Sequence, residues 1–230
     1  MRAHWVSDLT VQDSYVLRGD SLHHLVNVVR VEAGEELLLL NGKGLMVLTI
    51  IEAISKKEIK LQFKEQQSRE QSYLFDLVLG MPKREALELC LKEATELGFR
   101  KIHLVRSDYS QMRFPEKERI EKLLVAALEQ SNAPYLPEVV ECRWEEIPWN
   151  SYGEIILMDS QTTNAPAIDS TNTSAARLLV VGPEGGFSPE ELSRLHQVEK
   201  LKIVNLPTPI LRTPTAVAVG AGLMIQSLRK

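Results

Sequence analysis

The chain has 230 residues, a mass of 26.0 kDa and a net charge of −4, with 44% hydrophobic and 25% charged residues. These ordinary globular values argue against disorder, collagen and coiled coil, and the length suits one large domain or two small ones. No apolar run approaches the roughly 18 residues that cross a bilayer, and no signal peptide is evident. The two cysteines have neither metal-binding nor redox spacing. We therefore expect a cytoplasmic protein with no membrane partner.

The first seventy residues contain short segments rich in Leu, Val and Ile. Strands are predicted over 36–41, 45–51 and 59–63. The sequence NGKG at 41–44 predicts a hairpin turn, because Asn and Gly tolerate positive φ. This spacing predicts a small β-barrel or sandwich. Residues 64–72 contain no apolar side chain and form the predicted linker.

Beyond the linker, the pattern changes to alternating strands and helices. Helices are predicted from Pro82 to a stop at Gly98, over 116–130, after a capping box at Ser188 and Glu191, and from Thr213 to about residue 228. The predicted strands cover 74–79, 101–105, 138–142, 155–158, 178–181 and 202–206. Strand–helix alternation with short connections predicts a largely parallel α/β sheet.

Two loops at predicted strand ends have the composition of a ligand site. Residues 182–187 (GPEGGF) contain adjacent glycines that let the backbone approach a ligand closely. Residues 206–214 (LPTPILRTP) place Arg212 beside a helix start. Ligands of α/β sheets bind at the carboxyl ends of strands, so backbone groups of both loops are suited to a nucleoside-like cofactor. A tight turn without a ligand and a surface role for Arg212 are the alternative interpretations.

Several other site classes lose support. The chain has no Gly-Lys-Ser/Thr phosphate loop and no Gly-x-Ser-x-Gly elbow, which argues against P-loop NTPases and serine hydrolases. Residues 220–222 (GAG) lie inside a predicted helix and fail as a dinucleotide fingerprint. His23 and His24 have no further ligand at metal spacing, so no metal site is expected.

Three segments together resemble the ribosomal RNA small subunit methyltransferase E family of the SPOUT superfamily. They are 181–188 (VGPEGGFS), 210–216 (ILRTPTA) and 92–98 (KEATELG), with weaker matches at 23–30, 82–83 and 129–131. Members of that family methylate N3 of a uridine in 16S rRNA. The order and spacing of the matches cover nearly the whole chain.

The resemblance implies a PUA-like RNA-binding β-barrel over residues 1–70 and a SPOUT methyltransferase domain with a deep trefoil knot over 73–230. Knots are rare exceptions among protein folds. It also implies S-adenosylmethionine as cofactor, 16S rRNA of the small ribosomal subunit as partner, and a homodimer.

By motif match, the resemblance implies which residues bind the cofactor. These are Leu157, Met158, Gly182, Glu184, Gly185, Gly186, Leu206, Ile210, Leu211, Arg212 and Ala216. Arg212 is the expected catalytic residue, because a cation beside a uracil carbonyl favours the N3 anion; no general base is identifiable. Candidate RNA-binding cations, with solvated surface charge as the alternative, are Arg2, Arg18, Arg30, Lys83, Arg84 and Arg113.

The chain departs from the family pattern at several positions. Pro214 replaces a usual Glu, Pro207 a usual Gly, and residues 107–110 (SDYS) a more basic segment. Pro suits the first turn of a helix, so the fold is expected to survive at position 214. These changes leave two alternatives open: a catalytically weak RNA-binding or ribosome-assembly factor, and a SPOUT methyltransferase that acts on a different RNA.

Overall fold

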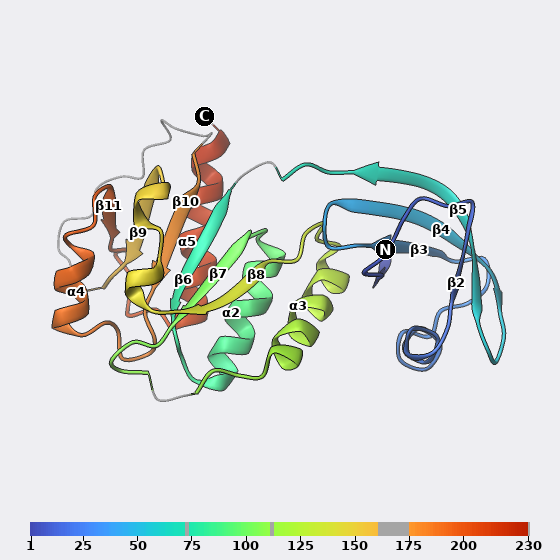
Figure 1. The fold of residues 1–230 in the computed structure, drawn as a ribbon, viewed down its shortest axis with the longest axis horizontal. Helices are drawn as coiled ribbons and strands as arrows, with labels where there is room; N and C mark the ends of the chain where they lie inside the picture. Colours follow the sequence, from blue (N-terminus) through green and yellow to red (C-terminus); the bar gives the residue numbers. More distant parts are fainter. Residues whose placement is uncertain (72–73, 111–112, 161–174, 230) are drawn as a thin grey trace. The chain divides into compact units, whose positions relative to one another are not determined.

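The computed structural model describes residues 1–71, 74–110, 113–160 and 175–229 (Figure 1). The chain forms two compact units, one of Met1–Gln71 with Leu128–Leu136 and the other of Ser72–Ala127 with Pro137–Lys230. No helix within the described ranges is both long enough and apolar enough to cross a membrane.

The first unit is built on a five-stranded sheet of order β1-β3-β4-β5-β2. Its strands are β1 (Arg2–Trp5), β2 (Ser14–Leu17), β3 (Glu36–Leu40), β4 (Leu45–Ile54) and β5 (Ile59–Ser68), and α1 (Asp20–His23) and the π-helix η1 (His24–Val29) follow β2. β1 runs parallel to β3, and the other pairs are antiparallel. β1 and β2, which are four residues long and lie at the sheet edges, were not predicted from the sequence.

The predicted hairpin turn is confirmed. Gly42 and Gly44 have φ of 68° and 98°, and the Asn41 side-chain oxygen accepts the N–H groups of Lys43 and Leu45 at 2.7 and 3.0 Å. The prediction of a linker from residue 64 is wrong as far as residue 68, because β5 continues to Ser68 along β4. Backbone pairing sustains this strand although its side chains are polar. Residue 72 of that prediction lies outside the described residues.

The end of a later helix packs with this first unit. Leu128 and Ala133 share a buried cluster with Ala3 and other residues of β1, β3 and β4. Glu129 accepts the Trp5 N–H at 2.9 Å. Nothing in the sequence predicts that the end of this helix packs in a different core from the rest of the helix.

The second unit is a six-stranded, wholly parallel sheet of order β11-β9-β10-β6-β7-β8, which confirms the predicted parallel α/β class. Its strands are β6 (Phe75–Gly80), β7 (Lys101–Val105), β8 (Glu138–Cys142), β9 (Glu154–Met158), β10 (Arg177–Val181) and β11 (Leu201–Val204). The helices are α2 (Arg84–Glu96), α3 (Lys117–Ser131), α4 (Pro189–Leu195) and α5 (Thr213–Gln226), with short 3-10 turns at Trp144–Glu146, Trp149–Ser151 and Ser227–Arg229.

Both faces of this sheet are covered, so its central strands are buried throughout. On one face, Leu157 and Val180 share a core with Leu195 of α4. On the other, α5 packs along β10 (Figure 1), where a Cβ on Gly220 would lie only 2.7 Å from Leu179. The glycine therefore permits a close helix–strand approach.

Helix ends follow local chemistry. α2 does not start at Pro82 as predicted: its N-cap is Lys83, because the chain is still extended at Met81, whose N–H bonds to the Val105 carbonyl. Gly98 has φ of 78° and follows the last turn of α2, which confirms the predicted stop. The Ser188 and Glu191 capping box of α4 is confirmed with both reciprocal hydrogen bonds present.

Candidate functional site

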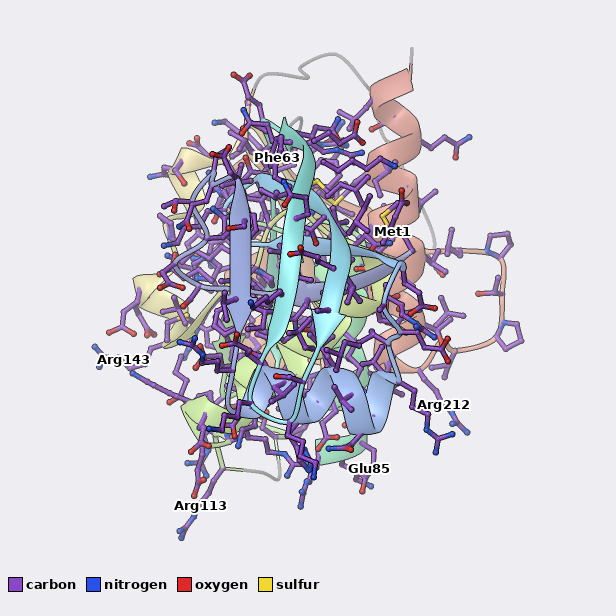
Figure 2. The ribbon with its side chains drawn as sticks, turned by 90° about the vertical axis from the view of Figure 1, so that its right-hand side faces the viewer. Met1, Phe63, Glu85, Arg113, Arg143 and Arg212 are labelled. Carbon is purple, nitrogen blue, oxygen red and sulfur yellow. The ribbon has the colours of Figure 1, made fainter. Side chains whose placement is uncertain are left out.

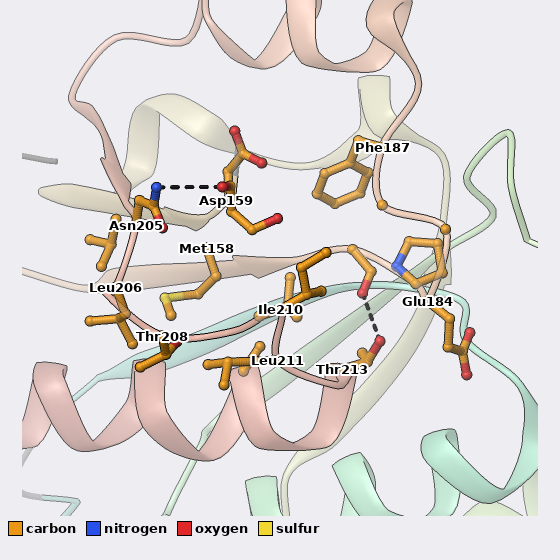
Figure 3. A pocket seen from close by; sticks show the side chains of 18 of the residues that line it. Met158, Asp159, Glu184, Phe187, Asn205, Leu206, Thr208, Ile210, Leu211 and Thr213 are labelled. Carbon is orange, nitrogen blue, oxygen red and sulfur yellow. Dashed lines mark hydrogen bonds between the residues drawn. The ribbon is translucent and has the colours of Figure 1, made fainter. Parts of the chain in front are cut away.

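A pocket of about 210 Å³ lies at the carboxyl ends of three adjacent strands of the second unit (Figure 3). Met158 ends β9, Val181 ends β10 and Val204 ends β11, and all three line it. The first turn of α5 completes the wall with Thr213 and Ala216. Strand ends of a parallel sheet are where ligands of α/β proteins bind.

The two loops singled out from the sequence meet in this pocket. Residues 182–187 line one side and residues 205–211, apart from Pro207, line another. The Thr213 hydroxyl joins the segments by donating to the Gly182 carbonyl at 3.2 Å (Figure 3). The two loops that the sequence marked as suited to a cofactor therefore line the same pocket.

Most of the residues predicted for cofactor binding line the pocket: Met158, Gly182, Glu184, Gly185, Gly186, Leu206, Ile210, Leu211 and Ala216. Leu157 does not line it, because its side chain is fully buried in the core on the α4 face of the sheet. Successive strand residues face opposite sides, and Met158 is the one that faces the pocket.

The glycine loop adopts a conformation that requires glycine. Gly186 has φ of 71°, and its N–H closes a turn onto the Pro183 carbonyl at 2.9 Å. A Cβ on Gly182 would lie 3.3 Å from the backbone of Gly186, and one on Gly80 would lie 2.7 Å from Pro183. The loop is folded tightly onto itself and onto the end of β6.

The Glu184 carboxylate fastens this loop to α2. Its two oxygens accept the backbone N–H of Lys83, the N-cap of α2, at 3.1 and 3.2 Å. A carboxylate at a helix N-terminus is stabilised by the unpaired N–H groups and the helix dipole. Figure 3 shows the side chain turned away from Met158 and Leu206.

A second carboxylate, from Glu191, holds the end of the loop from inside the protein. Glu191 is 3% exposed. Its carboxylate accepts hydrogen bonds from the N–H groups of Ser188 (2.8 Å) and Asp108 (3.1 Å) and from the Trp144 indole (3.1 Å). The capping box is visible in the sequence, whereas the links to Asp108 and Trp144 join residues far apart in the chain and have no sequence signal.

The other wall of the pocket offers apolar side chains and backbone donors. Ile210 is 84% exposed at the rim. Within the described part of the chain, the N–H groups of Ile210 and Leu211 donate to no acceptor, which leaves them available to a ligand. The ionisable lining residues in that same described part are Asp159 and Glu184, both acidic. Their charge favours a ligand that carries positive charge.

Arg212, the predicted catalytic residue, is the N-cap of α5 between the lining residues Leu211 and Thr213. Its side chain is exposed and projects outward (Figure 2) rather than lining the pocket. Pro214 lies in the first turn of α5, which confirms the expectation that proline is compatible with the fold there.

The predicted RNA-binding cations fall into two groups. Arg2, Arg18 and Arg84 form ion pairs with Glu35, Glu58 and Glu88 respectively. The exposed side chains of Arg30, Lys83 and Arg113 pair with no carboxylate among the residues that the structure describes. The second group is therefore the more available for contact with an anionic partner.

Comparisons with known proteins agree along the chain. Residues 69–225 match a family model described as an RNA methyltransferase domain, and residues 17–64 match an RNA methyltransferase PUA domain. Proteins named ribosomal RNA small subunit methyltransferase E are 27% identical in Rickettsia conorii, over 85% of this chain and 82% of that protein, and 29% identical in Mycobacterium bovis, over 90% and 84%.

The fold matches solved structures over nearly its full length. A ribosomal RNA small subunit methyltransferase E from Neisseria gonorrhoeae, solved with bound S-adenosyl methionine, superposes with a TM-score of 0.84 at 23% identity and covers 98% of this chain and 97% of that one. A second solved chain, from Legionella pneumophila and also in complex with this cofactor, gives a TM-score of 0.82 at 21% identity, with 97% of each chain covered.

Proposed function

Because the chain belongs to the RNA methyltransferase family that includes ribosomal RNA small subunit methyltransferase E, we propose that it methylates N3 of a uridine in 16S rRNA with S-adenosylmethionine as methyl donor. The observation that carries the proposal is the convergence of the glycine loop and the 205–211 loop on one pocket at the strand ends. This family membership covers both the methyltransferase sheet and the PUA unit.

The chemistry of the pocket fits that donor. Met158, Leu206 and Leu211 provide apolar contact for an adenosyl group, and the backbone N–H groups of the 210–211 segment suit its polar edges. The acidic lining favours the positive charges of a sulfonium and an ammonium. Glycine at 186 keeps the loop in a shape that a side chain would strain.

When bound, S-adenosylmethionine supplies an electrophilic methyl group. The chain's own contribution is to hold nucleophile and donor in line and to exclude water, which accounts for most of the acceleration in such transfers. N3 of uridine is protonated at neutral pH and lies on the pairing edge, so the base must be presented unpaired. Arg212, whose exposed side chain lies outside the pocket lining between Leu211 and Thr213, is assigned to stabilise the uracil anion as N3 loses its proton.

Finer features follow from the family resemblance and belong to the same proposal. They are a barrel-like closure of the PUA unit, a trefoil knot in the methyltransferase domain, domain limits of 1–70 and 73–230, a homodimer and a cytoplasmic location with ribosomes. The parallel order β11-β9-β10 and the packing of α5 along β10 support the SPOUT assignment. Light scattering of the purified protein tests the dimer.

The proposal is tested by calorimetric titration with S-adenosylmethionine, followed by methylation of small-subunit particles and mass spectrometry of the digested nucleosides. We expect binding and 3-methyluridine. Gly186→Ala should weaken cofactor binding. Gly34→Ala, at another open position of positive φ (89°) but in the PUA unit, is its matched control and should leave cofactor binding unchanged.

Two results would overturn the proposal in different ways. A folded wild-type protein that binds no S-adenosylmethionine would favour a non-catalytic RNA-binding or assembly factor. Cofactor binding with a product other than 3-methyluridine in 16S rRNA would favour methylation of another RNA or another atom.

A further inference from the structure

A short turn after β7 is held in shape by its own hydrogen bonds. The Ser110 N–H donates to the Ser107 carbonyl at 2.9 Å, the Ser107 N–H donates to the Ser110 hydroxyl at 3.1 Å, and the two hydroxyls lie 3.0 Å apart. Ser107 is itself only 3% exposed. Residues 107–110, here called the SDYS turn, therefore have a fixed shape of their own.

The SDYS turn is also fastened to the cap of α4. The Asp108 N–H donates to the buried Glu191 carboxylate at 3.1 Å, and the Ser188 hydroxyl donates to the Asp108 carboxylate at 2.5 Å. Ser188 directly follows the glycine loop, so the turn and the loop share one anchor. Neither moves without breaking these bonds.

This anchoring places Tyr109 against the pocket wall. A Cβ built on Gly185 would lie 3.1 Å from the Tyr109 Cβ and 3.5 Å from its ring atoms Cγ and Cδ2, so the tyrosine touches a residue that lines the pocket. Tyr109 is nevertheless 49% exposed. Exposure of a large ring on a rigid turn leaves a preformed face for a partner.

Among the residues that the structure describes, no other phenylalanine, tyrosine or tryptophan offers such a face at this mouth. Within the described residues, Tyr109 is the one phenylalanine, tyrosine or tryptophan in the exposed class. Phe187, which also lines the pocket, packs edge-on against Trp144 with ring centroids 5.3 Å apart, and it is 9% exposed. Phe187 is therefore committed to the core.

The charge of the turn indicates what Tyr109 contacts. Asp108 is the single charged residue of the SDYS turn and exposed Arg106 precedes the turn, so the turn itself offers no cation that would bind a phosphate group. The flat face of a nucleobase carries no such charge and stacks well on an aromatic ring. Chemistry at N3 needs a base that has lost its own stacking neighbours.

We propose that Tyr109 is a substrate-contacting residue whose ring stacks on an unpaired nucleobase of the RNA at the mouth of the pocket. This inference rests on the proposed methyltransferase function. The hydrogen bonds of the SDYS turn to Glu191 and Ser188 hold that ring in a fixed position.

The test compares Tyr109→Ala and Tyr109→Phe with the wild-type enzyme for methylation of small-subunit particles and for cofactor binding. Tyr109→Ala should lower kcat/KM for RNA roughly 5- to 150-fold, the loss of one stacked base. Its Kd for S-adenosylmethionine should stay within about twofold of the wild-type value, since the ring lies outside the pocket lining. Tyr109→Phe keeps the ring face and should retain most activity.

Leu89→Ala on α2, which truncates a side chain of similar exposure (51%), is the control and should change neither quantity. Unchanged kcat/KM in Tyr109→Ala would overturn the inference. So would an equal loss in Tyr109→Phe, which would assign the effect to the phenol, or a parallel loss of cofactor binding, which would assign it to the pocket. A wild-type protein that methylates nothing would instead count against the proposed function.

Discussion

The packing of α5 on the sheet yields a prediction with a built-in control, because the helix carries two glycines two residues apart. A Cβ on buried Gly220 would lie 2.7 and 3.0 Å from the two Cδ atoms of Leu179 and 3.3 Å from the sulfur of Met158. A Cβ on exposed Gly222 would meet nothing within 4 Å. We therefore compare Gly220→Ala with Gly222→Ala.

The magnitudes follow from two opposing effects. Replacing glycine by alanine inside a helix stabilises it by about 0.5–1 kcal/mol at either position. At Gly220, overpacking against fully buried Leu179 costs about 1–3 kcal/mol in addition. Because the helix contribution cancels in the comparison, Gly220→Ala should melt roughly 2–12 °C below Gly222→Ala.

Thermal melts followed by circular dichroism measure this difference, and titration with S-adenosylmethionine measures its consequence. Met158 lines the pocket, so Gly220→Ala should also weaken cofactor binding while Gly222→Ala leaves it unchanged. Leu179→Val removes the crowding Cδ atoms and should cost less in the Gly220→Ala background than alone. Equal melting temperatures for the two alanine variants, with no coupling to Leu179, would refute the proposed close packing.

Three further predictions concern buried polar groups. Burial lowers the pKa of His103 below its ordinary value of about 6.5, so as the pH falls the imidazole is protonated in the unfolded chain before it is protonated in the folded protein. The free energy of unfolding should therefore decrease as the pH drops below 6.5. His103→Gln should make this decrease smaller, which is measured as the difference in unfolding free energy between pH 7.5 and pH 5.5. Asp76 is fully buried and accepts hydrogen bonds from Arg100 (3.0 and 2.6 Å) and the Tyr152 hydroxyl (2.8 Å), so Asp76→Ala should destabilise the protein by about 3 kcal/mol in a denaturant titration, and a change below 1 kcal/mol would contradict this network. Ser188→Ala removes the cap of α4 and the bond to Asp108 and should cost about 1–2 kcal/mol, whereas Ser188→Thr, which keeps a hydroxyl, should cost less in the same titration.

Much of the candidate site was predictable because each of its two loops is formed by residues that lie close together in the sequence. Adjacent glycines after a buried strand, and a proline at the start of a helix after another strand, mark two loops at the same edge of any parallel sheet. Once the strands are assigned correctly, the sequence alone therefore places both loops, with Gly185 and Leu211, at the same pocket. The resemblance to a methyltransferase family added the identity of the ligand.

Other features depended on the assembled fold. In a parallel sheet both faces are buried, so hydrophobicity did not reveal that Met158 faces the pocket while Leu157 faces the core. Pro82 resembled a helix start, but the chain remains extended there through the Met81 bond to Val105.

The sequence by itself determined the parallel α/β class, the starts of α4 and α5, the stop of α2, and the two loops that meet in the pocket, since each depends on the conformational preferences of neighbouring residues. Only the tertiary structure decided that Leu128–Leu136 packs with the first unit, that Glu191 binds Asp108 and Trp144, and that Tyr109 lies against Gly185. These contacts join residues tens of positions apart. They exist because the crossovers of the sheet bring those residues together, and no local pattern encodes that.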